Sequence, residues 1–319
     1  TDKKELPGAS LKVTDEDGNT VDEWVSKEEA HIIKGLIVGK KYKMTETKPA
    51  DGYVTAESIE FTVKNTKEVQ KHQMLDDMTK VEISKKDIAD SSEVPGAKLI
   101  ILDKDGKKVD SWTSTDKPHM VEKLPVGEYT LREEQAPDGY LIAEDVKFTV
   151  KDTGKVQKVK MKDAHPYGKL VIKKTDSTSK AALPGAEFEL REKESGKVVE
   201  KLVTDKTGTA TSGKIPIATY KNGKVEKTVE YILVETKAPN GYELSSKKEE
   251  IRFEYKDGKT KVIEIVKEIK NTKSPSGSTP TGNSPKTGDS TNIWLPILLA
   301  VLSACGIGGV IWYKKKKGN

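Results

Sequence analysis

The chain has 319 residues, 34% of them hydrophobic and 34% charged, which suggests two or three small β-domains of roughly 100 residues rather than one large enzyme core. The formal net charge is +5, but Lys314 to Lys317 supply most of it, so the rest of the chain offers no basic surface for nucleic acid. With one cysteine and four histidines in the sequence, we expect no intrachain disulfide, no structural zinc and no cofactor.

A threefold repeat fills residues 1–272. The tripeptide Pro-Gly-Ala occurs at 7–9, 95–97 and 184–186, each time followed by a strand-like run, and Gly-Tyr follows at 52–53, 139–140 and 241–242. The third copy has extra polar sequence around 211–230. Short strands bounded by Gly, Pro and Asp, without helical periodicity, predict a β-sandwich in each repeat. We therefore expect all-β, Ig-like domains at 1–78, 79–165 and 166–272, the first without its N-terminal strand.

Acidic turns follow the first strand-like run in two repeats, at 15–18 and 103–106. They could be read as calcium loops, but the later ligands and the closing Glu of an EF-hand are absent from the sequence. Hairpin turns are the favoured interpretation, and no metal site is expected.

Strand alternation places polar residues on the core face of every repeat. Lys85 shares a face with Val81 and Ile83, and Lys174 with Leu170 and Ile172. The neighbouring Lys86 and Lys173 have the opposite parity. Asn271 lies with Ile269, although Lys267 interrupts that pattern unless a bulge intervenes. The residues expected to face the cores are Lys85, Glu133 and Asp163, then Lys174, Glu235 and Asn271, and in the first repeat Glu46 and Asp76.

Buried charges are unfavourable unless they are paired or neutralised. We hypothesise that each lysine amine joins the Asp or Asn carbonyl in an amide, assisted by the Glu. Burial lowers the pKa of Lys and raises that of Asp and Glu, and the fold supplies proximity. Asp163 would lose water and Asn271 ammonia. A buried ion pair or a solvated lysine remains the alternative.

The first repeat has no lysine at the equivalent position. The third repeat reads Lys174-Thr175-Asp176 and the chain starts Thr1-Asp2, so we hypothesise that the missing Lys and strand immediately precede Thr1. Lys3 and Lys4 fall past that strand. We expect the first domain to lack an edge strand and to be the least stable of the three.

The tail predicts a membrane span. Ile293 to Tyr313 contains no charge and would form roughly 30 Å of helix, enough to cross a bilayer. Lysines 314–317 follow at once and should stay cytoplasmic, with the preceding residues outside the membrane. A buried core helix is the alternative interpretation. No signal peptide is visible, so we expect a secretion signal to be missing from this sequence.

Ser284, Pro285, Lys286, Thr287 and Gly288 precede this span, after a Pro/Ser/Gly linker at 273–283. This arrangement resembles the sortase sorting signal LPxTG of Gram-positive bacteria, with Ser in place of Leu. The resemblance implies cleavage between Thr287 and Gly288 and transfer of Thr287 to an amine of peptidoglycan or of a pilin subunit. The protein would then be secreted and cell-wall-anchored, with the span in the plasma membrane only before sorting. A plain membrane anchor with a chance match is the alternative.

Three Leu/Val-Pro-Gly-Ala segments, each followed by a Tyr-x-Leu-x-Glu-like run and an Ala-Pro-x-Gly-Tyr-like run, resemble Cna protein B-type or SpaA-like (prealbumin-like) pilin domains. The family implies Lys–Asp or Lys–Asn isopeptide bonds assisted by Glu. Lys85–Glu133–Asp163 and Lys174–Glu235–Asn271 are then complete triads, whereas Glu46 and Asp76 lack their lysine.

We therefore expect a wall-anchored surface stalk or pilin-like structural protein, with sortase as a partner. The alternative is an adhesin whose domains themselves bind host extracellular matrix or glycan. An enzyme is not expected, because the sequence contains no Gly-x-Ser-x-Gly, HExxH or phosphate-binding glycine motif. The amide formation would be a single intramolecular turnover.

Overall fold

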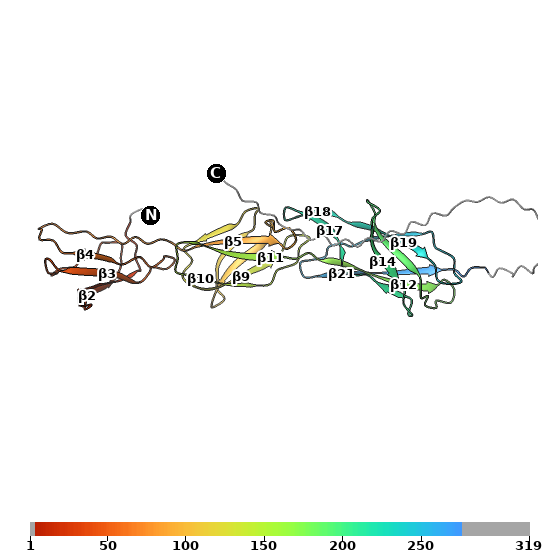
Figure 1. Cartoon of the computed structure of the whole chain (residues 1–319), viewed down its shortest axis with the longest axis horizontal. Helices are drawn as coiled ribbons and strands as arrows, with labels where there is room; N and C mark the ends of the chain where they lie inside the picture. The colour runs from red at the N-terminus through yellow and green to blue at the C-terminus, as the bar shows by residue number, and fades with distance from the viewer. Residues whose placement is uncertain (1–3, 276–319) are drawn as a thin grey trace, which may run out of the picture. The chain divides into compact units, whose positions relative to one another are not determined.

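The computed structural model describes residues 4–275, in which every regular element is a β-strand (Figure 1). Helices that could span a bilayer are not found in this part of the chain. The predicted span at 293–313 and the predicted sorting signal at 284–288 lie outside the described residues. We refer to residues 1–78, 79–165 and 166–272 as repeats 1, 2 and 3.

Repeat 1 contains one four-stranded sheet within the described residues, in the order β2-β1-β3-β4. Its small core gathers around Val13, Tyr42 and Met44, which lie on the inward faces of β1 and β3. The strands are β1 (Ser10–Thr14), β2 (Thr20–Val25), β3 (Lys41–Lys48) and β4 (Ile59–Thr62).

Repeat 2 is a sandwich of two sheets, with strand orders β10-β9-β6-β7 and β11-β5-β8. A single apolar cluster, which includes Ile83, Ile101, Leu131 and Met161, draws buried residues from both sheets. The strands are β5 (Lys80–Asp87), β6 (Lys98–Asp103), β7 (Lys108–Thr113), β8 (His119–Glu122), β9 (Gly127–Gln135), β10 (Val146–Val150) and β11 (Val156–Asp163).

Repeat 3 has the same plan. One sheet has the order β14-β13-β19-β20; in the other, β12 pairs with β15, β16 and β21. The extra sequence of this repeat forms short strands that include the hairpin β17-β18. The strands are β12 (Tyr167–Asp176), β13 (Glu187–Glu192), β14 (Val198–Val203), β15 (Thr209–Thr211), β16 (Ile215–Pro216), β17 (Ala218–Lys221), β18 (Lys224–Thr228), β19 (Glu230–Lys237), β20 (Lys248–Arg252) and β21 (Val262–Asn271).

The acidic segments are hairpin turns, as the sequence predicts. The Asp15 Oδ1 atom accepts the backbone amides of Asp17 and Asn19, and Asp103 accepts those of Asp105 and Lys107. These carboxylates are thus occupied in closing their own turns.

The first and last strands of repeats 2 and 3 lie side by side and run parallel. β5 pairs with β11 so that Lys85 is opposite Met161 and Asp87 is opposite Asp163. β12 pairs with β21 so that Lys174 is opposite Ile269 and Asp176 is opposite Asn271. In both repeats the lysine therefore pairs with the residue two positions before the acid or amide of the neighbouring strand. The lysine and the acid or amide point to the same face of the sheet.

This pairing corrects the expectation that repeat 1 lacks an edge strand. The corresponding strand in repeat 2, β5, is central in its sheet, between β11 and β8. The described part of repeat 1 contains no counterpart of β5, so the segments that correspond to β8 and β11 have no strand between them to pair with. The segments 31–34 and 70–77 accordingly form no strand, and no second sheet is present in residues 4–78.

Candidate crosslinking sites

Repeat 2 contains a sealed cluster of one amine and two carboxyls. Lys85, Glu133 and Asp163 come from β5, β9 and β11 and are 2%, 4% and 0% exposed. The Lys85 Nζ atom lies 2.9 Å from the Glu133 Oε2 atom and contacts the Asp163 Oδ1 atom. The side chains that the sequence placed on the core face are thus brought together, 78 residues apart in the chain for Lys85 and Asp163.

The pKa of Asp163 is raised to about 7, chiefly by burial; the Lys85 amine opposes this rise and the neighbouring Glu133 adds to it. Two buried oxygen atoms in this cluster, Glu133 Oε1 and Asp163 Oδ2, have no hydrogen-bond donor. A proton on one of the two carboxyls would remove this deficit. The site therefore favours a neutral carboxyl beside the lysine amine.

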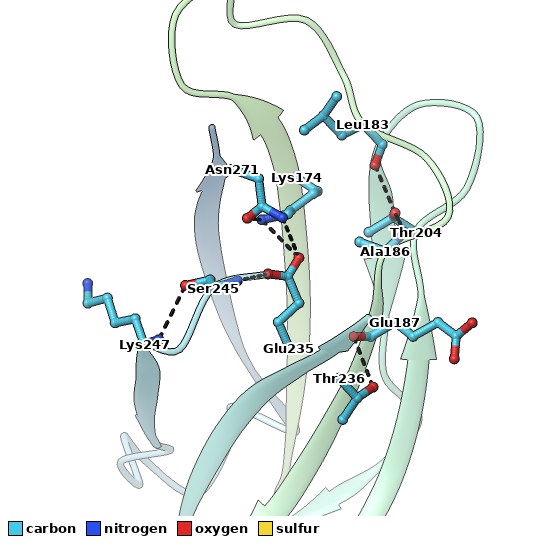
Figure 2. A network of polar contacts seen from close by, with 10 residues as sticks. All are labelled: Lys174, Leu183, Ala186, Glu187, Thr204, Glu235, Thr236, Ser245, Lys247 and Asn271. Carbon is cyan, nitrogen blue, oxygen red and sulfur yellow. Dashed lines mark hydrogen bonds and ion pairs between the residues drawn. The ribbon is translucent and has the colours of Figure 1, made fainter. Parts of the chain in front are cut away.

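Repeat 3 repeats this arrangement with an amide in place of the second acid (Figure 2). Lys174 is 0% exposed on β12, Glu235 is 4% exposed on β19 and Asn271 is 2% exposed at the end of β21. The Lys174 Nζ atom contacts Asn271 Oδ1 and lies 3.2 Å from Glu235 Oε1, which also accepts the Asn271 amide at 2.9 Å.

Glu235 is therefore positioned between the amine and the amide nitrogen. Its other oxygen accepts the Ser245 backbone amide at 2.9 Å, as Glu133 accepts that of Ala143 at 2.6 Å. Burial lowers the pKa of Lys174, with Glu235 acting in the opposite direction. A buried lysine of lowered pKa is closer to the neutral, nucleophilic form.

Repeat 1 retains the acid part of the site. Glu46 is 4% exposed and accepts the Ala56 backbone amide at 2.5 Å, as its counterparts do in the other repeats. Burial raises the pKa of Glu46 to about 7, and Asp76 contributes in the same direction. Burial also raises the pKa of Asp76. The two carboxyls influence each other and therefore lie close together; burial is the largest influence on both pKa values, while the Ala56 amide lowers that of Glu46 and a hydrogen bond with Glu46 lowers that of Asp76.

The neighbouring lysines lie on the other face, as their parity predicts. Lys86 forms an ion pair with Glu93 at 2.8 Å, and Lys173 is exposed. Lys4 is also exposed, while Lys3 lies outside the described residues.

The bulge considered near Lys267 is not needed. The pairing of β21 with β12 runs without a shift, and Lys267 lies half-buried on the inward face, with its amine 3.8 Å from Glu249. Its long side chain carries the charge to the edge of the core, so the alternation that reaches Asn271 is unbroken.

Sequence reasoning missed a second buried polar pair next to each complete site. Two residues beyond the lysine, Asp87 and Asp176 are 0% and 2% exposed and accept the phenol hydroxyls of Tyr140 and Tyr242, at 2.7 and 2.9 Å. Backbone amides of Ser179 and Thr178, and then the Tyr242 hydroxyl, lower the pKa of Asp176 to about 2. In the sequence these tyrosines belong to the Gly-Tyr marker and both lysines to a Lys-x-Asp triplet, but neither motif indicates that the two meet.

The chain belongs to the SpaA prealbumin-like fold domain family, whose model matches residues 1–77, 79–165 and 168–269. The tandem all-β repeats are therefore prealbumin-like domains. All the residues of the three acid and amine clusters lie within these matches except Asn271, which follows the third by two residues.

Several solved structures are similar. The Bacillus anthracis TIE protein is 29% identical, over 85% of this chain and 49% of its own, with a TM-score of 0.52. The chain thus spans about half the length of that protein. BcpA, the major pilin subunit of Bacillus cereus, is 19% identical over 86% of this chain and 97% of its own, with a TM-score of 0.44. The full-length major pilin SpaD of Corynebacterium diphtheriae is 16% identical over 61% of this chain and 98% of its own, with a TM-score of 0.28. The comparison with curated proteins gives no match.

Proposed function

We propose that the protein is a surface stalk or pilin-like structural protein whose second and third repeats are each locked by an internal isopeptide bond. The proposal rests on one observation: in both repeats a fully buried lysine on the first strand contacts an Asp or Asn carbonyl oxygen on the last strand, beside a buried Glu. Membership of the SpaA domain family agrees with a structural role.

In repeat 2 the Lys85 Nζ atom attacks the Asp163 carbonyl carbon. The new C–N bond forms as a C–O bond breaks, and the oxygen leaves as water with protons from the amine and from the carboxyl. Glu133, in contact with the amine, transfers the proton. Because the fold holds the reacting groups in contact, the activation barrier is lowered by about 7–11 kcal/mol relative to separate groups in solution.

In repeat 3 the C–N bond to the Asn271 amide nitrogen breaks and ammonia leaves. Glu235 accepts a hydrogen bond from both the attacking amine and the leaving nitrogen, so one oxygen can take a proton from the first and deliver it to the second. Each product is a neutral amide, which removes the free-energy penalty of a buried ion pair.

The position of the bonds suits a load-bearing protein. The chain enters repeat 2 at β5 and leaves it at β11, and Lys85 and Asp163 lie near the ends of these strands. Tension would pass from Lys85 through the isopeptide bond to Asp163, which is 78 positions further along the sequence, without loading the chain between them. A bond that closes a loop of this size also lowers the conformational entropy of the unfolded chain. On the chain-entropy model used for disulfides, this stabilises the folded repeat by about 4–5 kcal/mol.

Attachment to the cell wall completes the proposal. The Ser284–Gly288 segment followed by an apolar run and lysines supports cleavage by a sortase after Thr287 and transfer to an amine of peptidoglycan or of another pilin subunit. The protein would then be held outside a Gram-positive cell, and would cross the plasma membrane only before sorting.

Intact-mass measurement of the purified full chain tests the bonds. We expect the mass to be lower than the encoded mass by one water and one ammonia. Lys85→Arg should restore the water and Lys174→Arg the ammonia. Lys86→Arg and Lys173→Arg are matched controls from the outer face and should keep both losses. A full encoded mass for the unmodified chain would contradict the proposal.

A further inference from the structure

Repeat 3 carries an extra hairpin, β17-β18, in the connection that precedes β19. We propose that this hairpin is a strut that fixes repeat 3 against repeat 2, so that the junction between these two repeats does not act as a hinge. Residues up to Ser274 belong to one compact unit, and the contacts that carry the inference lie within it. The strut goes beyond the proposed function, because it concerns the junction between two repeats and not the bond inside either.

The base of the hairpin is anchored in the core of repeat 3. Ile217 and Val229 flank the hairpin, are 3% and 5% exposed, and belong to the apolar cluster of this repeat. The Val229 amide donates to the Ile217 carbonyl oxygen at 3.0 Å. Beyond this base, β17 and β18 form a separate two-stranded sheet, and every residue of β18 is exposed. An isolated two-stranded hairpin is only marginally stable in water, so its outer part needs a second support.

Tyr220 of β17 provides this support by contacting repeat 2. Its hydroxyl donates to the Gly139 carbonyl oxygen at 2.8 Å. Its ring stacks on the imidazole of His165, with ring centroids 3.5 Å apart, and meets the ring of Tyr140 edge-on at 5.2 Å. Tyr140 is 0% exposed, whereas its counterpart in repeat 3, Tyr242, is half-buried. The hairpin thus places an aromatic side chain with a satisfied hydroxyl at the junction.

The turn of the hairpin lies close to repeat 2 because it contains a glycine. Asn222 and Gly223 form a two-residue turn with φ angles of 52° and 68°, as a type I′ hairpin turn requires. A Cβ atom at position 223 would collide with the carbonyl oxygen of Glu93. The next residue, Val94, donates its amide to the Lys85 carbonyl oxygen at 2.7 Å. The turn therefore approaches a segment of repeat 2 that is itself fixed to the central strand β5.

The glycine of the Gly-Tyr marker receives the following repeat at both junctions. A side chain at Gly52 would collide with the backbone of Lys123, in the connection between β8 and β9, and one at Gly139 would collide with Val225 of β18. At Gly241, the third marker glycine, no described residue lies within 4 Å of that position. The same connection thus approaches the preceding repeat in repeats 2 and 3, and in repeat 3 it is enlarged to a hairpin.

Two neighbouring amides report separately on repeat 2 and on the junction. The Leu141 amide donates within repeat 2, to the Ala164 carbonyl oxygen at 2.9 Å. The Ile142 amide donates to the Gly258 carbonyl oxygen of repeat 3 at 2.8 Å. The second bond persists only while the two repeats keep the same relative position, because hydrogen bonds tolerate little change in distance.

A fixed junction has most effect in a stalk whose repeats cannot unfold. The chain passes from β11 to β12 through Ala164, His165 and Pro166, and a single short connection of this kind permits rotation between domains. A second attachment through the hairpin restricts that rotation. If repeats 2 and 3 are each locked internally, as the proposed function holds, they should move under load as one rigid body.

Amide hydrogen exchange of the full chain, measured at single residues, tests the strut. Tyr220→Ala and Gly223→Ala should each lower the protection of the Ile142 amide by about tenfold or more, because a few well-packed aromatic contacts carry most of the free energy of an interface. The protection of the Leu141 amide should not change, because repeat 2 stays folded.

Two variants serve as matched controls. Thr219→Ala changes an exposed residue on the same strand as Tyr220. Gly196→Ala introduces a side chain at the same φ of 68° as at Gly223, but with no described residue within 4 Å. Both controls should retain the protection of Ile142. Unchanged protection of Ile142 in both test variants would overturn the strut, and so would an equal loss at Leu141, which indicates unfolding of repeat 2 instead of opening of the junction.

Intact mass separates this result from the proposed function. Loss of water and ammonia measures the internal bonds, whereas exchange at Ile142 measures the junction. If the mass losses are present but Ile142 does not respond to Tyr220→Ala or Gly223→Ala, the strut is wrong and the bonds stand. If Ile142 responds but the chain has its full encoded mass, the strut stands and the isopeptide proposal fails.

Discussion

Lys174 and Asn271 are 97 residues apart in the sequence, yet the lysine amine contacts the amide oxygen of the asparagine in the buried interior of repeat 3. The contact exists because the first and last strands of the repeat pair in parallel, with Asp176 opposite Asn271. Lys174 is thus two residues out of register with Asn271 on the same face of the sheet, and its long side chain reaches the asparagine carbonyl. The same offset recurs between Lys85 and Asp163.

Glu133→Gln should prevent the bond in repeat 2 without removing any apolar contact. Gln cannot accept and return a proton as the carboxyl does, so Lys85 and Asp163 should stay separate. We expect the variant to lose only ammonia relative to its own encoded mass, and the free energy of unfolding of repeat 2 to fall by about 4 kcal/mol.

The matched control is Glu134→Gln, on the exposed face of the same strand. It should retain both mass losses and the unfolding transition of the unmodified chain. Equal melting temperatures for the Glu133 and Glu134 variants, measured by calorimetry, would show that Glu133 is dispensable.

Force applied to the two ends of the chain should not extend repeats 2 and 3 beyond their folded length. In Lys174→Arg, repeat 3 should unfold in a step of about 330 Å, since 97 residues become stretchable at roughly 3.4 Å each. Single-molecule pulling measures this step directly. Lys173→Arg should show no such step, and a step of this length in the unmodified chain would indicate that no bond is present.

Repeat 1 should become less stable as the pH rises. The pKa of Glu46 is raised from 4.5 to about 7 in the folded state, so folding is favoured most below pH 4.5, where the carboxyl is protonated in both states. The advantage is lost as the pH rises through 7, because the unfolded state releases its proton more readily. Asp76 acts in the same direction.

Hydrogen-exchange protection of β3, corrected for the intrinsic pH dependence of exchange, measures this effect. Protection should be higher at pH 5 than at pH 8, and the difference should shrink in Glu46→Gln. The equivalent strand of repeat 2, β9, serves as the internal reference. Protection of β3 that is independent of pH would rule out the buried acid pair.

Tyr140→Phe should destabilise repeat 2 without affecting its crosslink. The variant removes a hydroxyl that donates to the buried Asp87 carboxylate at 2.7 Å, leaving His165 and the Ala89 amide as partners. A loss of about 1–3 kcal/mol is expected from such a deletion. The measurement is denaturant unfolding together with intact mass.

Tyr167→Phe is the control for this substitution. Its ring lies 5.0 Å from the Lys214 ammonium, an interaction that phenylalanine retains. If the two variants were equally stable, the Asp87–Tyr140 pair would contribute little.

Most of the fold class and the inward residues could be predicted, because a strand alternates with a period of two and this fixes the face of every side chain. Lys85, Glu133 and Asp163 were assigned to the core on this basis and are buried there. The alternation says nothing about which strands are neighbours. It therefore does not indicate that the first strand of a repeat is central, and the prediction of an edge strand is wrong because β5 lies between two others.

Two further features depended on side-chain length and tertiary contacts. Lys267 interrupts the apolar alternation of its strand, but its side chain is half-buried and its amine lies near Glu249. The Asp87–Tyr140 and Asp176–Tyr242 pairs join residues 53 and 66 positions apart. A turn marker and a strand terminus give no local sign that they meet, so these pairs required the three-dimensional structure.

The parallel pairing of first and last strands has a consequence for resistance to proteases. Once Lys85 is bonded to Asp163, the polypeptide between them becomes a closed ring that includes nearly the whole repeat. A protease that cuts a single peptide bond in one of its surface loops would open the ring but release no fragment. The nicked molecule would remain one covalent piece, still attached at both ends.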